Sequence, residues 1–359
     1  MNKYINEHIS DKALQQLSHD IRSWGTELGF QQLAITDTRL ADYRPALENW
    51  LAAGYHGEMA YMARNRNKRC QPEKLLPGTV RVIAVRMDYA KEKTNSLAPM
   101  GVRNKAYIAR YARGRDYHKM MRKRLQSLAQ RIESETGHFG YRVFVDSAPV
   151  LERALAEKAG LGWIGKNTML INKQAGSWFF LGEIFTDLPL PVDAADNADH
   201  CGSCNACLDI CPTGAFVKPG QMDATRCISY LTIELRSSIP MELRPLMGNR
   251  VFGCDDCQLV CPWNKFSKQS NEEDFSPRHQ LDDSELVALF AWSEAEFMSN
   301  TAGSPIRRIG YVCWLRNLAV ALGNAEPDAE VIAALEARKN HSSELVREHV
   351  HWALSQHQQ

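Results

Sequence analysis

The sequence lacks long hydrophobic runs. No run of about 18 or more apolar residues occurs in the 359 residues, which excludes a membrane-spanning helix of ordinary length. Residues 1–10 are mostly polar and lack the apolar core of an export signal, so we expect a soluble, cytoplasmic protein. With 44% hydrophobic and 24% charged residues, the composition is that of a globular protein with room for two or three domains.

Cysteine, in contrast, is plentiful, and eight of the ten cysteines form two runs. The first run has the spacing C-x2-C-x2-C-x3-C-P of bacterial ferredoxins, in which the fourth cysteine binds the other cluster. The second run contains an insertion of 26 residues after its first cysteine. We therefore predict two 4Fe-4S clusters, the first held by Cys201, Cys204, Cys207 and Cys261, the second by Cys211, Cys227, Cys254 and Cys257.

Zinc sites and disulfides are the alternatives for these cysteines. Structural zinc sites lack the third close cysteine and the Cys-Pro ending, and disulfides would require export. Cys70 and Cys313 stand outside both runs, and we expect them to be small buried hydrophobic residues without a further role.

The net charge of +1 hides an uneven distribution. Residues 61–131 contain nineteen Lys or Arg and four acidic residues, so the rest of the chain is acidic. Such a basic segment suggests binding to a polyanion, most commonly a nucleic acid, and a solvated basic face is the alternative.

Three regions follow from the patterns. We expect an α/β domain over 1–193, a ferredoxin-like α+β domain with two clusters over 194–277, and an all-α domain over 278–359. In the first, apolar residues at helical spacing predict helices around 14–24 and 121–132, and alternation predicts strands around 80–84 and 141–145. Its ligand site should lie at the carboxyl ends of the strands, where Asp146 stands. Residues 188–193 contain two prolines and predict a linker.

The third region has two similar helical patterns about 40 residues apart. This period favours a HEAT-like pair of repeats that packs on the cluster domain, and an unrelated helical hairpin is the alternative. Two other motifs are weak. Residues 160–165 fit GxGxxG but follow a helical pattern rather than a strand, and two Glu-x-x-His pairs lack partner carboxylates for a di-iron site.

Four stretches together resemble one enzyme family over nearly the whole chain. The sequences GRDYH (114–118), VDSAPVLER (145–153), AGLGWIGKN (159–167) and MGNR (247–250) are similar to those of epoxyqueuosine reductases. The resemblance implies a nitroreductase-like first domain that binds cobalamin, two 4Fe-4S clusters and a tRNA anticodon loop as substrate. The implied reaction removes the epoxide oxygen of epoxyqueuosine at the wobble position and yields queuosine.

The resemblance also implies site residues. Asp146 matches the proton donor, and we expect burial against the apolar corrin to raise its pKa so that it is protonated near neutrality. A turn carboxylate that accepts from the Ala148 amide is the alternative. Asp116, Tyr117 and Arg153 match positions near the substrate, where Tyr117 would stack on a base or on the corrin. Asp146, Lys166, Ser177 and Ser229 are candidate cobalamin contacts. Cobalt ligation by His118 is conceivable.

Two other functions remain possible at this point. A plain ferredoxin-type electron carrier would explain the clusters but not the basic segment. A corrinoid reductive dehalogenase would share both cofactors, but such enzymes typically carry a twin-arginine signal, and this chain begins without an Arg-Arg pair. We expect a monomer that receives electrons from an external low-potential donor and does not bind a membrane.

Overall fold

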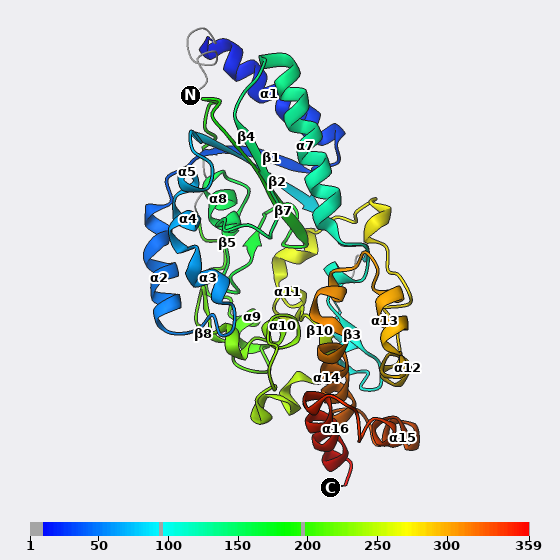
Figure 1. The fold of residues 1–359 in the computed structure, drawn as a ribbon. Coiled ribbons are helices and arrows are strands. Elements are labelled where there is room, and N and C mark those ends of the chain that lie inside the picture. Colours follow the sequence, from blue (N-terminus) through cyan, green and yellow to red (C-terminus); the bar gives the residue numbers. More distant parts are fainter. Residues whose placement is uncertain (1–9, 93–95, 195–197, 359) are drawn as a thin grey trace.

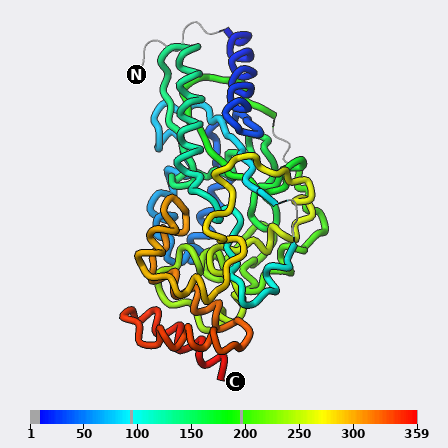
Figure 2. Tube along the Cα trace, turned by 90° about the vertical axis from the view of Figure 1, so that its right-hand side faces the viewer, coloured from blue at the N-terminus to red at the C-terminus, as the bar shows by residue number. Residues whose placement is uncertain are grey.

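The computed structural model describes residues 10–92, 96–194 and 198–358. Residues 1–9, on which most of the expectation about an export signal depends, lie outside this part. Within the described part, no helix combines the length and the apolar character that crossing a bilayer would require. In Figures 1 and 2, the first helix lies at one end of the molecule and the last helix at the other.

A four-stranded antiparallel sheet forms the core of the N-terminal part. Its strand order is β1-β2-β7-β4, with β1 at Gln32–Asp37, β2 at Arg81–Asp88, β7 at Phe179–Thr186 and β4 at Tyr141–Phe144. The strands predicted around 80–84 and 141–145 are therefore present. The rule used to place the ligand site applies to open parallel sheets, so it does not hold for this antiparallel sheet.

Helices cover both faces of the sheet (Figure 1). Helix α1 (Asp11–Glu27) and helix α7 (Tyr117–Thr136) bury their apolar faces on one side, together with Phe180 and Ile184 of β7. Both helices were predicted from their periodicity. Helix α8 (Glu152–Lys158) lies on the other side, against Ala84 of β2 and Phe185 of β7.

Short elements surround this sheet and the cysteine runs. The helices are α2 (Arg44–Ala52), α3 (Ala60–Arg64), α4 (Arg66–Cys70), α5 (Pro72–Leu75), α6 (Ala98–Gly101), α9 (Ala206–Asp209), α10 (Ile228–Ile233) and α11 (Asp256–Leu259). The remaining strands pair as β5 (Trp163–Ile164) with β6 (Leu170–Ile171), β8 (Phe216–Lys218) with β9 (Gln221–Met222), and β3 (Tyr107–Ile108) with β10 (Arg250–Phe252).

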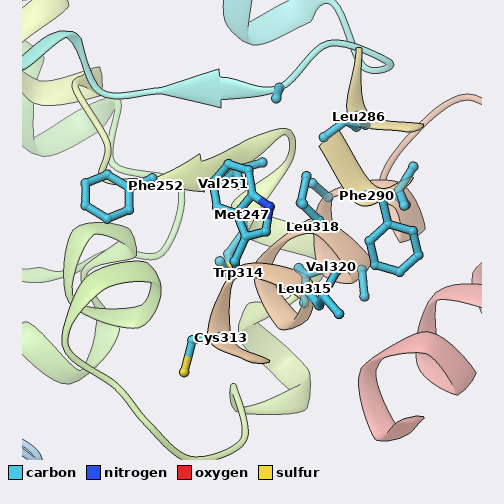
Figure 3. Close-up of a cluster of buried hydrophobic side chains, with 14 of the residues drawn as sticks. Met247, Val251, Phe252, Leu286, Phe290, Cys313, Trp314, Leu315, Leu318 and Val320 are labelled. Atoms are coloured by element: carbon cyan, nitrogen blue, oxygen red, sulfur yellow. The ribbon is translucent and has the colours of Figure 1, made fainter. Parts of the chain in front are cut away.

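The C-terminal part is helical. It contains α12 (Leu286–Ala291), α13 (Glu294–Asn300), α14 (Gly310–Gly323), α15 (Ala329–Ala337) and α16 (Glu344–Gln356). Helix α14 is buried over most of its length, and Trp314, Leu315 and Leu318 pack against Val251 of β10 and Phe290 of α12 (Figure 3). The expectation that this region packs on the cluster region is therefore confirmed.

The predicted linker packs on the first region, and the pairing of two strands joins this region to the later ones. The proline-containing linker after β7 is held against β1, because the Asp193 carboxylate accepts from the Ile35 amide at 2.7 Å. Strand β3 from the first region pairs in parallel with β10, and Ile108 lies in the same buried cluster as Leu318 of α14. The chain therefore builds continuous cores across the boundaries expected at 193 and 277.

Candidate functional site

Asp146 stands at the turn that follows β4. Its backbone has a φ of 54°, a left-handed conformation that is uncommon for a residue with a side chain. The Glu152 carboxylate, at the start of α8, holds this turn by accepting from the Asp146 amide at 2.5 Å. The Asp146 carboxylate accepts from the Tyr117 hydroxyl at 3.0 Å, and its Oδ2 lies 3.0 Å from His118 Nε2. Among the described residues it has no bond to Ala148, so the turn-carboxylate alternative is wrong.

His118 lies between two carboxylates. Its Nδ1 is 2.5 Å from Asp116 Oδ1, and its Nε2 faces Asp146. Desolvation lowers the pKa of His118, but the hydrogen bonds to Asp116 and Asp146 raise it to about 9. Desolvation also raises the pKa of Asp146, yet the bond and charge of His118 lower it below its ordinary value. The groups that the protein itself supplies therefore favour a charged Asp146 beside a protonated His118, and the expected effect of the corrin on the pKa of Asp146 stays a prediction.

Asp116 and Tyr117 have partners within the protein. Asp116 caps helix α7 by accepting from the His118 amide at 3.0 Å. The Tyr117 ring stacks on Phe180, with 3.7 Å between ring centroids, and on His118 at 4.2 Å. Because Phe180 and His118 already stack on the ring, the structure does not support Tyr117 as a platform for a base.

Further charged groups surround Asp146. Desolvation, the charge of Glu234 and the charge of Asp146 together raise the pKa of Tyr61 to about 12. The charge of Arg308 also acts on Asp146. Arg153 donates to the Thr168 carbonyl, and the charge of Glu152 acts on its guanidinium group. The Nε of buried Arg69 has no hydrogen-bond partner among the described residues, which fits a polar ligand at this place.

The cysteines form two neighbouring sets. Burial raises the pKa of Cys207 to about 11, and the next causes are the charges of Cys261, Cys201 and Cys204. Burial likewise raises the pKa of Cys227 and Cys257, and the charge of Cys211 acts on both. Groups of cysteine thiols that lie close enough to act on one another are the kind of ligand set that binds an iron-sulfur cluster. No group of three or more His, Cys, Asp or Glu in the described part is arranged around a single metal ion.

The other candidate cobalamin contacts have protein partners. Lys166 donates to the carbonyls of Gly202 and Cys204, at 2.7 and 2.9 Å, and so fixes the loop of the first cysteine run. Ser177 is buried and accepts from Gln258 at 3.0 Å. Ser229 forms a hydrogen bond with the Cys227 thiol. Lys166 and Ser177, which precede β7 in sequence, thus connect the first region to the two cysteine runs.

The basic segment does not form one continuous patch. Arg69, Arg86 and Arg113 are buried, and Arg124 and Arg131 pair with acidic residues. Exposed Arg103 and Arg115 also pair with acidic residues, and two groups stand out among the other exposed basic residues. One lies on α3 and α4, with Arg64, Arg66 and Lys68, and the other on α7, with Lys119, Arg122 and Lys123.

The glycine motif at 160–165 follows helix α8 and contains β5, so it lacks the preceding strand of a dinucleotide-binding GxGxxG loop. A Cβ atom on Gly162 would lie 2.1 Å from the Ile171 carbonyl oxygen, so this glycine permits close packing of β5 and β6. Cys70 and Cys313 are buried, as expected.

Sequence reasoning missed three functional groups around Asp146. His118 was considered only as a cobalt ligand, although the Asp-x-His spacing at a helix start could have indicated the Asp116–His118 pair. Glu152 lay within the recognised motif without a role. Glu183 lies in an otherwise apolar strand, and no local signal distinguishes it.

The antiparallel sheet, the proton-bearing pair and the two cysteine sets define an iron-sulfur oxidoreductase. The family model described as "4Fe-4S double cluster binding domain" matches residues 200–264, and that described as "Epoxyqueuosine reductase QueG, DUF1730" matches residues 69–147. The chain belongs to the epoxyqueuosine reductase family.

Relatives that match this chain over nearly their full length support the family assignment. The chain is 60% identical to the epoxyqueuosine reductase of Pseudomonas aeruginosa, over 98% of both chains. It is 55% identical to that of Escherichia coli K12, over 96% of this chain and 90% of the relative. A solved epoxyqueuosine reductase with an epoxyqueuosine-modified tRNA-Tyr stem loop has a TM-score of 0.86 and 30% identity, over 95% of this chain and 90% of that one.

A structure of the Bacillus subtilis enzyme has a TM-score of 0.85 and 30% identity, with the same coverage of both chains. It is described with an aspartate-bearing catalytic loop swung out of the active site.

Proposed function

We propose that this protein reduces epoxyqueuosine to queuosine at the wobble position of tRNA. The observation that carries the proposal is the full-length identity of 60% to an epoxyqueuosine reductase, together with the Asp146–His118 pair at the site. The conversion of an epoxide to an alkene consumes two electrons and two protons and releases water. Because the substrate is a tRNA, the enzyme would act in the cytoplasm.

The cysteine sets would hold two 4Fe-4S clusters, which pass single electrons from an external donor. Cobalamin, when bound, would supply a strongly nucleophilic metal centre. Arg69, whose Nε lacks a partner within the described part, and Arg153 are groups beside Asp146 that fit a polar cofactor or substrate. Lys166, Ser177 and Ser229 would act indirectly, because they position the cysteine loops.

Asp146 and His118 would donate a proton to the departing oxygen. The proton resides on His118 near neutrality, and Asp146 Oδ2 lies 3.0 Å from the imidazole, so the pair can release a proton without a strongly raised carboxyl pKa. The Tyr117 hydroxyl, which donates to the same oxygen, keeps Asp146 oriented. Asp116 positions the imidazole from the other side.

The tRNA would approach between α7 and the helical C-terminal part. Arg122 of α7 bonds the Ser147 hydroxyl at 3.3 Å, beside Asp146, and exposed Arg308 precedes α14. Both guanidinium groups suit phosphate contacts. The plain electron carrier and the reductive dehalogenase are not favoured, because relatives 52 to 60% identical to this chain are named epoxyqueuosine reductases.

The direct test is anaerobic incubation of the enzyme with reductant, cobalamin and tRNA that carries epoxyqueuosine. Mass analysis of the nucleosides should show the loss of one oxygen. If the reduced, cofactor-loaded wild type leaves the nucleoside unchanged, the proposal fails.

Asp146→Asn tests the proton donor in the same assay. We expect turnover to fall by about 10²-fold or more, which is the usual contribution of a general acid. Iron content and cobalamin absorbance should match the wild type. Full activity of this variant would remove Asp146 from the mechanism.

A further inference from the structure

A buried carboxyl group, that of Glu183, lies under the active-site turn and has no part in the proton donation by Asp146 and His118. Glu183 lies on the central strand β7, in register with Ala84 of β2 and Phe144 of β4, and its relative exposure is 0%. In the described part, neither carboxyl oxygen accepts from a backbone amide or a basic side chain, and the side-chain hydrogen bond that acts on its pKa is to Glu152. An unpaired buried carboxylate is costly, so a carboxyl group in such a place normally retains its proton.

Glu183 is connected to the active site through Glu152. Glu183 shares the α8 face of the sheet with Phe179 and Phe185, and the groups that act most strongly on it are Glu152 of α8 and Asp146. Glu152 in turn accepts from the Asp146 amide and so supports the left-handed turn. Three carboxyl groups thus run from the sheet interior to the active site in the order Glu183, Glu152, Asp146.

We propose that Glu152 and Glu183 form a proton reserve that supplies the second proton of the reaction. This inference rests on the proposed function, because only a reaction that consumes two protons needs two acids. Both carbon-oxygen bonds of the epoxide break, the alkene π bond forms, and two electrons arrive from the external donor through the clusters. One proton comes from the Asp146–His118 pair and one from the glutamate pair, and the oxygen leaves as water. Solvent then reprotonates both pairs.

The electrostatics agree with this assignment. Desolvation and the charge of Asp146 raise the pKa of Glu152 to about 8. Desolvation and the charge of Glu152 raise the pKa of Glu183 well above its ordinary value. The titratable or charged groups on the surrounding elements include Asp37 of β1, Arg81, Arg86 and Asp88 of β2, Tyr117 and His118 of α7, Tyr141 and Arg142 of β4, Asp146, and Arg153, Glu157 and Lys158 of α8. Of these, Arg86 and Asp88 pair with each other, as do Lys158 and Asp37, which leaves the glutamate pair without a salt-bridge partner in the described part.

Infrared spectroscopy of the enzyme tests the pair without turnover. We expect the difference spectrum between wild type and Glu183→Gln to contain the C=O band of a protonated carboxylic acid. Between wild type and Glu152→Gln, the corresponding band should disappear as the pH rises through about 8. Glu157→Gln makes the same change on the same helix, away from Asp146, and should leave both signals in place. Difference spectra without a protonated carboxyl band would overturn the proposal.

Single-turnover kinetics of the reduced, loaded enzyme then test the role. Glu183→Gln and Glu152→Gln should each slow conversion at least about tenfold. They should also lose the wild-type decrease in rate as the pH rises through about 8, whereas Glu157→Gln should retain it. Iron content and circular dichroism identify a variant that has not folded, in which case the other variant decides. Wild-type rates in both variants would disprove the proton reserve. An inactive wild-type enzyme would instead disprove the proposed function, and the infrared experiment would still test the protonation of the two glutamates.

Discussion

At the scale of single residues, the position of one proton between His118 and Asp146 determines which group of the site acts as the acid. Asp146 is half exposed, with 51% of its side-chain surface accessible, whereas His118 is buried between Asp116 and Asp146. An imidazolium between two carboxylates is stable, because each carboxylate favours the charged ring. The acid of the site is therefore a histidine-carboxylate pair rather than an isolated carboxylic acid.

The pH dependence of stability should reveal this imidazolium. The folded pKa of His118, about 9, lies above the 6.5 of an unperturbed histidine. Its contribution is therefore fully present below about 6.5 and disappears as the pH rises through 9. We expect His118→Gln to destabilise the protein by about 2 kcal/mol near pH 6 and by little above pH 9, after allowance for solvent near Asp146. Thermal unfolding at both pH values measures this.

His138 provides the matched control. It also pairs with a carboxylate, Glu133, at 2.9 Å, but its side chain is 72% exposed. His138→Gln should therefore change the Tm little at either pH. If His118→Gln behaves like His138→Gln, the ring is not charged in the folded protein.

At the scale of elements, the cysteine loops determine which cluster each thiol would bind. Helices α9 and α11 pack against each other, and each precedes the last cysteine of its run, Cys211 or Cys261. The charge of Cys261 affects the pKa of Cys207 more than the charges of Cys201 and Cys204 do, and the charge of Cys211 affects the pKa of Cys227. This arrangement supports the crossed pairing predicted from the ferredoxin pattern.

Double variants test the crossed pairing. Cys261→Ser should remove about half of the iron, and adding Cys204→Ser should remove no more, because both thiols would bind the same cluster. Combining Cys261→Ser with Cys254→Ser should remove nearly all of it. Cys313→Ser, at a buried cysteine outside both runs, should retain the full iron content. Uncrossed pairing would reverse the results of the two double variants.

A buried asparagine joins the helical part to the cluster region. Asn317 of α14 donates to the carbonyls of Thr232 and Val251, both at 2.9 Å. Asn317→Ala leaves both carbonyls without this donor, so we expect a loss of about 2 to 3 kcal/mol and a lower Tm. Asn340→Ala, at an exposed position, should change the Tm little. An unchanged Tm in Asn317→Ala would show that the two parts are not joined by these bonds.

Local patterns predicted the elements better than their arrangement. Helices α1 and α7 follow from apolar residues at helical spacing, because that pattern depends only on near neighbours. The antiparallel order β1-β2-β7-β4 and the pairing of β3 with β10 join residues far apart in sequence, so no local pattern encodes them. The same holds for the site. Motifs located Asp146 and the cysteines. Glu183 could not be found in this way, because its interaction with Glu152 and Asp146 depends on the folded structure.

At the scale of the whole molecule, basic residues from distant segments meet near the active site. Arg122 belongs to the N-terminal part and Arg308 to the C-terminal part, yet both act near the Asp146 turn. Many of the basic residues in 61–131 form ion pairs within the protein, as Arg113 does with Glu92 at 2.7 Å. Recognition of tRNA should therefore depend on a few exposed cations around Asp146 rather than on the whole segment.

Salt-dependent binding tests this view. Each phosphate contact releases counterions, so the affinity for tRNA falls with salt, with a slope of roughly 0.7 to 0.9 per contact on a double-logarithmic plot. The double variant Arg122→Gln/Arg308→Gln should bind more weakly and reduce the slope by about 1 to 2. Lys339→Gln, which removes an exposed charge paired with Glu336 near the C-terminus, should match the wild type. Equal slopes in all three proteins would mean that the phosphates contact another surface, and the group on α3 and α4 would then be the next to replace.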